Sequence, residues 1–120
     1  MLFALDVSPH GRWTVVAITG ELELATAPRL RQAVVSLVGE GQVDIVLDLS
    51  GVDFLDSVGL GVIVSALKRV RGRDGRLVVA GAVPRVRALF ELTRLDEIID
   101  LHDTVDGALA TAGDRAVDDG

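Results

Sequence analysis

The feature that most constrains the fold is a continuous apolar run that leads directly into a helical stripe. Ile45, Val46 and Leu47 stand in a row, which is typical of a central strand covered on both faces. The next apolar residues recur every three or four positions and so share one side of a helix. They are Leu60, Ile63, Val64, Leu67 and Val70. A buried strand followed by an amphipathic helix predicts an α/β fold with parallel strands and helical crossovers.

Similar patterns predict the remaining elements. Strands are expected over residues 3–7, 13–22, 43–49 and 77–80, with a short last strand at Ile98 and Ile99. Helices are expected to begin at Thr26, Ser57, Pro84 and Thr104, with Thr26 as an N-cap and residue 112 as the last end. Residues 8–11 close an opening β-hairpin. We therefore predict a mixed sheet of about five strands with about four helices, in which a hairpin precedes alternating β and α elements.

Length and composition fit one domain. The chain has 120 residues, 49% of them hydrophobic, and no cysteine, which excludes disulfides and thiolate metal sites. We expect a domain over residues 1–112 and a flexible polar tail over 113–120. No apolar run reaches the roughly 18 residues of a membrane span, and no export signal is recognisable, so a cytoplasmic location is expected.

The net charge of −6 at pH 7 argues against a nucleic-acid or anionic-membrane partner. One stretch is basic, and we interpret it as a solvated helix end and turn, where cations favour the helix C-terminus. It contains Lys68, Arg69, Arg71, Arg73 and Arg76.

Enzyme chemistry finds little support in the residues. His10 and His102 belong to no HExxH or GxSxG motif, and no phosphate-binding glycine loop is present. A phosphate-receiver domain would need an acidic pair and a nearby lysine, but Asp6 is isolated and Lys68 is the only lysine. We therefore expect no enzymatic activity, no cofactor and no metal. A nucleophilic Ser57 stays open as an alternative that would require a nearby base.

Ser57 marks the one constellation with a clear functional interpretation. Serine is a good N-cap residue, so a capping role alone could explain it. However, Gly59 and Gly61 follow in the first turns of the same helix, where glycine is intrinsically unfavourable. We interpret these two glycines as keeping the backbone open to an approaching partner.

The neighbours of Ser57 support a contact surface. Val58 and Val62 fall off the core stripe and could either face a partner or pack on a neighbouring helix. Asp53 and Asp56 make the start of the helix an acidic corner. Phosphorylation of Ser57 would add about one to two negative charges there and expel an acidic or apolar partner without unfolding the domain.

The sequence resembles the anti-sigma factor antagonists, the single-domain members of the STAS family. The resemblance runs from about Leu5 to Thr111. Its strongest motif is Asp56-Ser57-Val58-Gly59-Leu60-Gly61, together with Gly20-Glu21-Leu22. The other matching segments are Ala25-Thr26-Ala27-Pro28, Val46-Leu47-Asp48-Leu49-Ser50, Phe54-Leu55, Gly81 with Pro84-Arg85-Val86, and Leu92-Thr93 with Leu95.

The resemblance implies a partner-switching function. The unmodified antagonist would bind an anti-sigma factor that is also an ATP-dependent serine kinase, in its ATP- or ADP-bound form, and so free the sigma factor. The kinase would phosphorylate Ser57, and a serine phosphatase would restore binding. The protein would be a monomer or weak dimer. The expected partner-binding residues are Glu21, Glu23, Thr26, Asp56, Ser57, Val58, Gly59, Leu60, Gly61 and Val62.

Two positions depart from the family pattern. Val58 stands where many members have a second hydroxyl residue, which leaves the phosphosite itself in place. Glu23 stands where many members have aspartate, so the charge is kept with a longer reach. The alternative function is a STAS interaction module in another phospho-signalling assembly.

Overall fold

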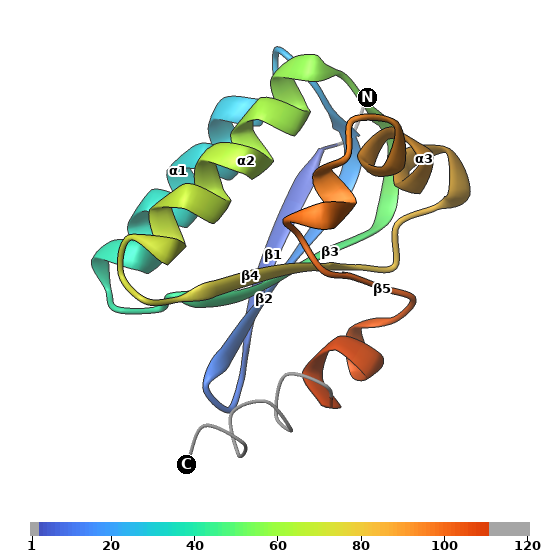
Figure 1. The fold of residues 1–120 in the computed structure, drawn as a ribbon. Helices are drawn as coiled ribbons and strands as arrows, with labels where there is room; N and C mark the ends of the chain where they lie inside the picture. Colours follow the sequence, from blue (N-terminus) through green and yellow to red (C-terminus); the bar gives the residue numbers. More distant parts are fainter. Residues whose placement is uncertain (1–2, 111–120) are drawn as a thin grey trace.

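A single sheet with helices on both faces forms the fold of the computed structural model, which describes residues 3–110 (Figure 1). The strands lie in the order β1-β2-β3-β4-β5. Only the β1–β2 hairpin is antiparallel, so the predicted mixed α/β architecture is confirmed. The strands are β1 (Ala4–His10), β2 (Trp13–Leu22), β3 (Asp44–Leu55), β4 (Arg76–Ala80) and β5 (Leu101–His102). The helices are α1 (Ala27–Gly39), α2 (Ser57–Arg71) and α3 (Pro84–Leu92), with a 3-10 turn at Leu95–Glu97 and helical residues at 105–110.

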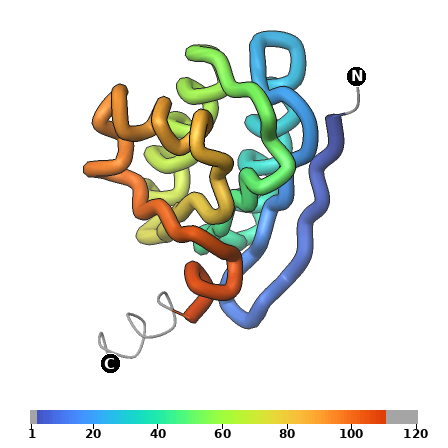
Figure 2. Tube along the Cα trace, turned by 90° about the vertical axis from the view of Figure 1, so that its right-hand side faces the viewer, coloured from blue at the N-terminus to red at the C-terminus, as the bar shows by residue number. Residues whose placement is uncertain are grey.

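The main core lies between the sheet and the pair α1 and α2, which run side by side over one face (Figure 1). A smaller cluster lies on the opposite face. There Ala108 of the last helical segment packs with Trp13 and Val46. Ile45, Val46 and Leu47 are all fully buried. β3 is therefore covered on both faces, as its continuous apolar run predicts. Figure 2 shows β1 as an edge strand on the side of the molecule away from α3.

β3 continues six residues beyond the predicted end at Leu49. Ser50, Gly51 and Asp53 have loop composition, which is why the sequence pattern misses the extension. Parallel β2 supplies pairing partners up to Leu55, with two irregularities in register. A Cβ atom at Gly51 would lie 2.9 Å from the carbonyl oxygen of Ile18, so only glycine lets the strands approach this closely.

Other predicted boundaries also shift. The hairpin turns at Gly11 and Arg12, not at residues 8–11, because Gly11 adopts a positive φ of 64°. The prediction of a last strand at Ile98 and Ile99 is wrong. Ile99 is a buried core residue, and pairing with β4 begins at Leu101. The last helix is present over residues 105–110, whereas residues 111–112 and the predicted tail over 113–120 lie outside the described residues.

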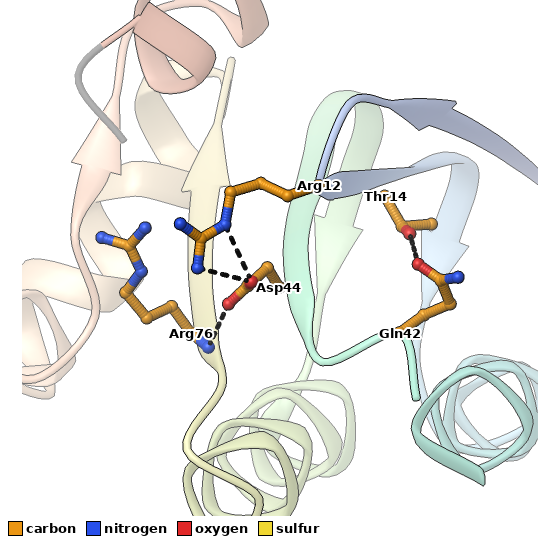
Figure 3. Close-up of polar contacts among 5 residues, drawn as sticks. All are labelled: Arg12, Thr14, Gln42, Asp44 and Arg76. Carbon is orange, nitrogen blue, oxygen red and sulfur yellow. Dashed lines mark hydrogen bonds and ion pairs between the residues drawn. The ribbon is translucent and has the colours of Figure 1, made fainter. Parts of the chain in front are cut away.

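A polar cluster fixes the starts of three strands at the end of the sheet remote from Ser57 (Figure 3). Asp44 accepts hydrogen bonds from the Arg12 side chain at 3.2 and 3.3 Å and from the backbone N–H of Arg76 at 3.1 Å. Beside it, the Thr14 hydroxyl donates to the Gln42 side chain at 3.1 Å. Asp44 therefore ties the β1–β2 turn, β3 and β4 together. Among residues 3–110, no helix has the length and apolar character needed to cross a membrane.

Candidate functional site

Ser57 lies just beyond the carboxyl ends of β2 and β3, which are the two longest parallel strands. Leu22 of β2 pairs with Leu55 of β3, and the N–H of Asp56 donates to the carbonyl oxygen of Leu22 at 3.3 Å. α2 begins at the next residue. The carboxyl ends of parallel strands are the usual place for a functional site in an α/β sheet.

The N-cap of α2 is Asp56, which corrects the capping role considered for Ser57. Asp56 has extended backbone geometry, and its Oδ1 accepts a hydrogen bond from the N–H of Gly59 at 2.8 Å. Ser57 is the first helical residue. Aspartate and serine cap helices about equally well, so the pair Asp56-Ser57 leaves the choice open in the sequence.

The second oxygen of Asp56 ties α2 to the turn that follows β2. Its Oδ2 accepts a hydrogen bond from the N–H of Leu24 at 3.2 Å. One carboxylate therefore holds two segments that are far apart in the sequence. This bond has no local sequence signal, because it depends on the pairing of β2 with β3.

Thr26 organises the same turn. It occupies the N-cap position of α1 as predicted, but its side chain makes no cap hydrogen bond. Instead its hydroxyl donates to the carbonyl oxygen of Glu21 at 2.6 Å and accepts from the N–H of Glu23 at 3.0 Å. The Glu23 carboxylate accepts from the N–H of Ala25 at 3.0 Å. The fold thus brings the expected residues of the β2–α1 turn to the corner where Asp56 lies.

Ser57 is exposed, and its hydroxyl forms no hydrogen bond with another residue in the 3–110 range. Asp56 caps the helix, so the Ser57 hydroxyl is not needed for a capping hydrogen bond. The Ser57 residue is accessible to solvent.

The two glycines of the motif have different surroundings. Gly59 is buried, and a Cβ atom there would clash with the carbonyl oxygen of Leu22 and lie 2.8 Å from Cδ1 of Leu55. Gly59 therefore lets α2 pack on the strand ends, and the interpretation that it keeps a surface open is wrong. Gly61 is exposed, and no atom lies within 4 Å of the position that a Cβ atom would occupy there. The backbone is therefore open at Gly61 but not at Gly59, and contact of Gly61 with a partner stays a prediction.

The apolar residues near Ser57 divide in the same way. Val58 is 39% exposed, whereas Leu60 and Val62 are half-buried against the main core. Two further exposed residues that were not among the expected partner-binding residues belong to the neighbouring segments: Leu24 is 68% exposed and Phe54 is 49% exposed. Leu24 could have been identified from the sequence, because a large apolar residue within a predicted turn is a signal for a contact surface.

The corner is acidic. Glu21, Glu23, Asp53 and Asp56 form no ion pair with another residue between 3 and 110. Arg85 brings one cation, since its Nε donates to the carbonyl oxygen of Asp53 at 2.8 Å.

Within residues 3–110, both histidines lie away from Ser57. His10 pairs with Trp13 at the far end of β2, and His102 pairs with Ala80 on the β4–β5 side of the sheet. Neither histidine hydrogen-bonds to Ser57. Residues 3–110 also contain no group of three or more histidine or acidic residues that could hold a metal ion.

Comparisons with known proteins agree with this arrangement. The STAS domain family matches residues 4–108. An anti-sigma-B factor antagonist of Staphylococcus epidermidis is 30% identical over 99 residues, which are 82% of this chain and 92% of the relative. The crystal structure of an anti-sigma factor antagonist from Mycobacterium paratuberculosis is 34% identical with a TM-score of 0.84, over 92% of this chain and 93% of its own. The phosphorylated form of SpoIIAA from Bacillus shares the fold, with a TM-score of 0.74 at 20% identity over 91% of this chain and 99% of its own.

Proposed function

The chain belongs to the STAS domain family, and from that membership we propose that it is an anti-sigma factor antagonist. Relatives with this name align over most of both chains. The observation that carries the proposal is the exposed Ser57 beside a preformed corner, with a hydroxyl that the fold leaves unused. Such a residue is suited to be another protein's substrate rather than a catalyst.

In this proposal the partner is an anti-sigma factor that is also a serine kinase. The unmodified chain binds it through the corner of Glu21, Glu23, Thr26 and Asp56 and through the start of α2 from Ser57 to Val62. Binding frees the sigma factor. Transfer of a phosphoryl group to Ser57 ends binding, and a serine phosphatase restores it. A cytoplasmic location belongs to the same proposal.

The start of α2 can accept the modification. The Asp56 carboxylate accepts the hydrogen bond from the N–H of Gly59. The N–H groups of Ser57 and Val58 have no acceptor inside the helix. These two donors, together with the helix dipole, can stabilise a phosphoryl group. The adjacent Asp56 carboxylate opposes it. The fold therefore survives phosphorylation, and its effect falls on binding.

A binding measurement tests the function. The purified chain is mixed, with ADP present, with the kinase-type anti-sigma factor encoded nearest to it, and complex formation is followed by size-exclusion chromatography. We expect a complex with the wild-type chain and weakened binding for Ser57→Asp, with an unchanged circular dichroism spectrum. If no such anti-sigma factor binds, the antagonist function is wrong, and the alternative of another phospho-signalling assembly takes its place.

A further inference from the structure

Two exposed apolar residues, Leu24 and Val58, lie next to the two hydrogen bonds of the Asp56 carboxylate, since it accepts from the N–H of Leu24 and from the N–H of Gly59, the residue after Val58. We propose that Leu24, Val58 and the open backbone of Gly61, together called the Leu24–Val58 patch, form the centre of the surface that the anti-sigma factor covers. We further propose that the matching surface of the partner is apolar at its centre and basic at its rim. This inference rests on the proposed function and specifies the chemistry of its partner.

The patch is held together by the fold. Asp56 accepts the N–H of Leu24 through one oxygen and the N–H of Gly59, which follows Val58, through the other. Leu24 is 68% exposed although it belongs to a turn fixed by the hydrogen bonds of Thr26. A rigid apolar side chain in water loses little entropy when a partner covers it, which favours its use as an anchor.

Gly61 extends the patch along α2. It lies three residues after Val58 and therefore on the same side of the helix. No atom lies within 4 Å of the position that its Cβ would occupy. A side chain of the partner can therefore approach the helix backbone next to Val58.

The rim indicates the charge of the partner. The carboxylates of Glu21, Glu23 and Asp53 surround this corner, and within residues 3–110 they have no ion-pair partner. The basic residues of α2, Lys68, Arg69 and Arg71, lie in its last turn, at the opposite end of the helix. Arg85 is one cation at this corner, since it donates to the carbonyl oxygen of Asp53, and it offsets only part of this negative charge. Complementary potentials across an interface therefore favour a basic surface opposite this rim.

A basic rim raises a question about the switch, since cations would attract a phosphoryl group. Ser57 immediately precedes Val58, however, so its phosphoryl group would lie at the apolar centre. Covering it there strips water from a dianionic group that has only two backbone N–H donors and no cation beside it, and this cost exceeds the return from solvent-exposed ion pairs at the rim. Loss of hydration, rather than repulsion by an acidic partner, then ends binding.

The experiment is a calorimetric titration of the purified anti-sigma factor with matched variants of the chain. Leu24→Ser and Val58→Ser should each weaken binding by about tenfold. Leu92→Ser is the control, because Leu92 is 80% exposed and lies at the end of α3. It should change the dissociation constant by less than about twofold. Circular dichroism checks that each variant is folded.

Salt separates the two explanations of the switch. Added salt should weaken binding of the wild-type chain, because it screens an acidic rim from a basic one. It should not restore binding of Ser57→Asp. Recovery of Ser57→Asp in high salt, or equal affinities of Leu24→Ser and Leu92→Ser, would overturn the proposed partner chemistry while the antagonist function stands. A wild-type chain that fails to bind would overturn both.

Discussion

The carboxylate of Asp56 accepts the N–H of Gly59 at 2.8 Å, and this bond makes Asp56, not Ser57, the N-cap of α2. The same carboxylate accepts the N–H of Leu24. The helix cap and the hydroxyl that we propose as the phosphosite therefore belong to adjacent residues. Because Asp56 makes the cap, phosphorylation or substitution of Ser57 should leave α2 stable.

This division predicts different stabilities for two alanine variants. Asp56→Ala removes the cap and the bond to Leu24, and it should lower the free energy of unfolding by about 1–2 kcal/mol. Ser57→Ala should lower it by less than about 0.5 kcal/mol. Urea denaturation measures both, and Asp56→Asn is the control because asparagine also caps helices. Equal losses in the two alanine variants would contradict the assignment of the cap.

The two glycines of the motif should respond to alanine with opposite signs. Gly59→Ala forces a Cβ atom against Leu22 and Leu55 and should destabilise the domain by about 1–3 kcal/mol. Gly61→Ala meets open space within a helix and should stabilise it by up to about 1 kcal/mol. Thermal unfolding of the pair is the measurement. A stabilised Gly59→Ala variant would show that α2 can move away from the strand ends at little cost.

The sequence predicts the architecture well because its central signals are strong. The apolar run at 45–47 and the stripe that ends at Val70 identify β3 and α2, and the family motifs identify Ser57. The patterns fail where tertiary pairing overrides local composition. Gly51 in β3 shows this, since its strand exists only because β2 lies beside it.

The details of the site depend on such long-range contacts as well. The bond from Leu24 to Asp56 spans 32 positions, and no local pattern contains it. Gly59 and Gly61 look equivalent in the sequence, yet only the packing of α2 on Leu22 distinguishes them. The residues of the candidate site could therefore be proposed from the sequence, whereas the contacts that each residue makes required the fold.

Asp44 should contribute to stability but not to partner binding. Its side chain is 12% exposed and accepts hydrogen bonds from Arg12 and Arg76 at the end of the sheet remote from Ser57. Asp44→Ala should cost about 1–3 kcal/mol of unfolding free energy. The matched control is Asp103→Ala, which removes an ion pair between Asp103 and Arg87. The Asp103 side chain is 94% exposed, so this substitution should cost less than about 1 kcal/mol of unfolding free energy. Guanidinium denaturation would compare the two. If folded Asp44→Ala bound the anti-sigma factor more weakly, the interface would lie at the Asp44 end of the sheet, which would contradict its proposed position near Ser57.

Phosphorylation is expected at one residue. Incubation of the chain with its kinase-type anti-sigma factor and ATP should add a single phosphoryl group, detected by intact mass spectrometry. Among the serines of residues 3–110, only Ser57 combines exposure with a position in the first turn of a long helix next to the proposed partner contact. Ser57→Ala should abolish the addition. Ser50→Ala is the control, since Ser50 is also exposed but belongs to β3. An added group that persists in Ser57→Ala and disappears in Ser50→Ala would move the phosphosite to the sheet. The modified chain should keep its circular dichroism spectrum, because Asp56 still caps α2 after Ser57 is charged.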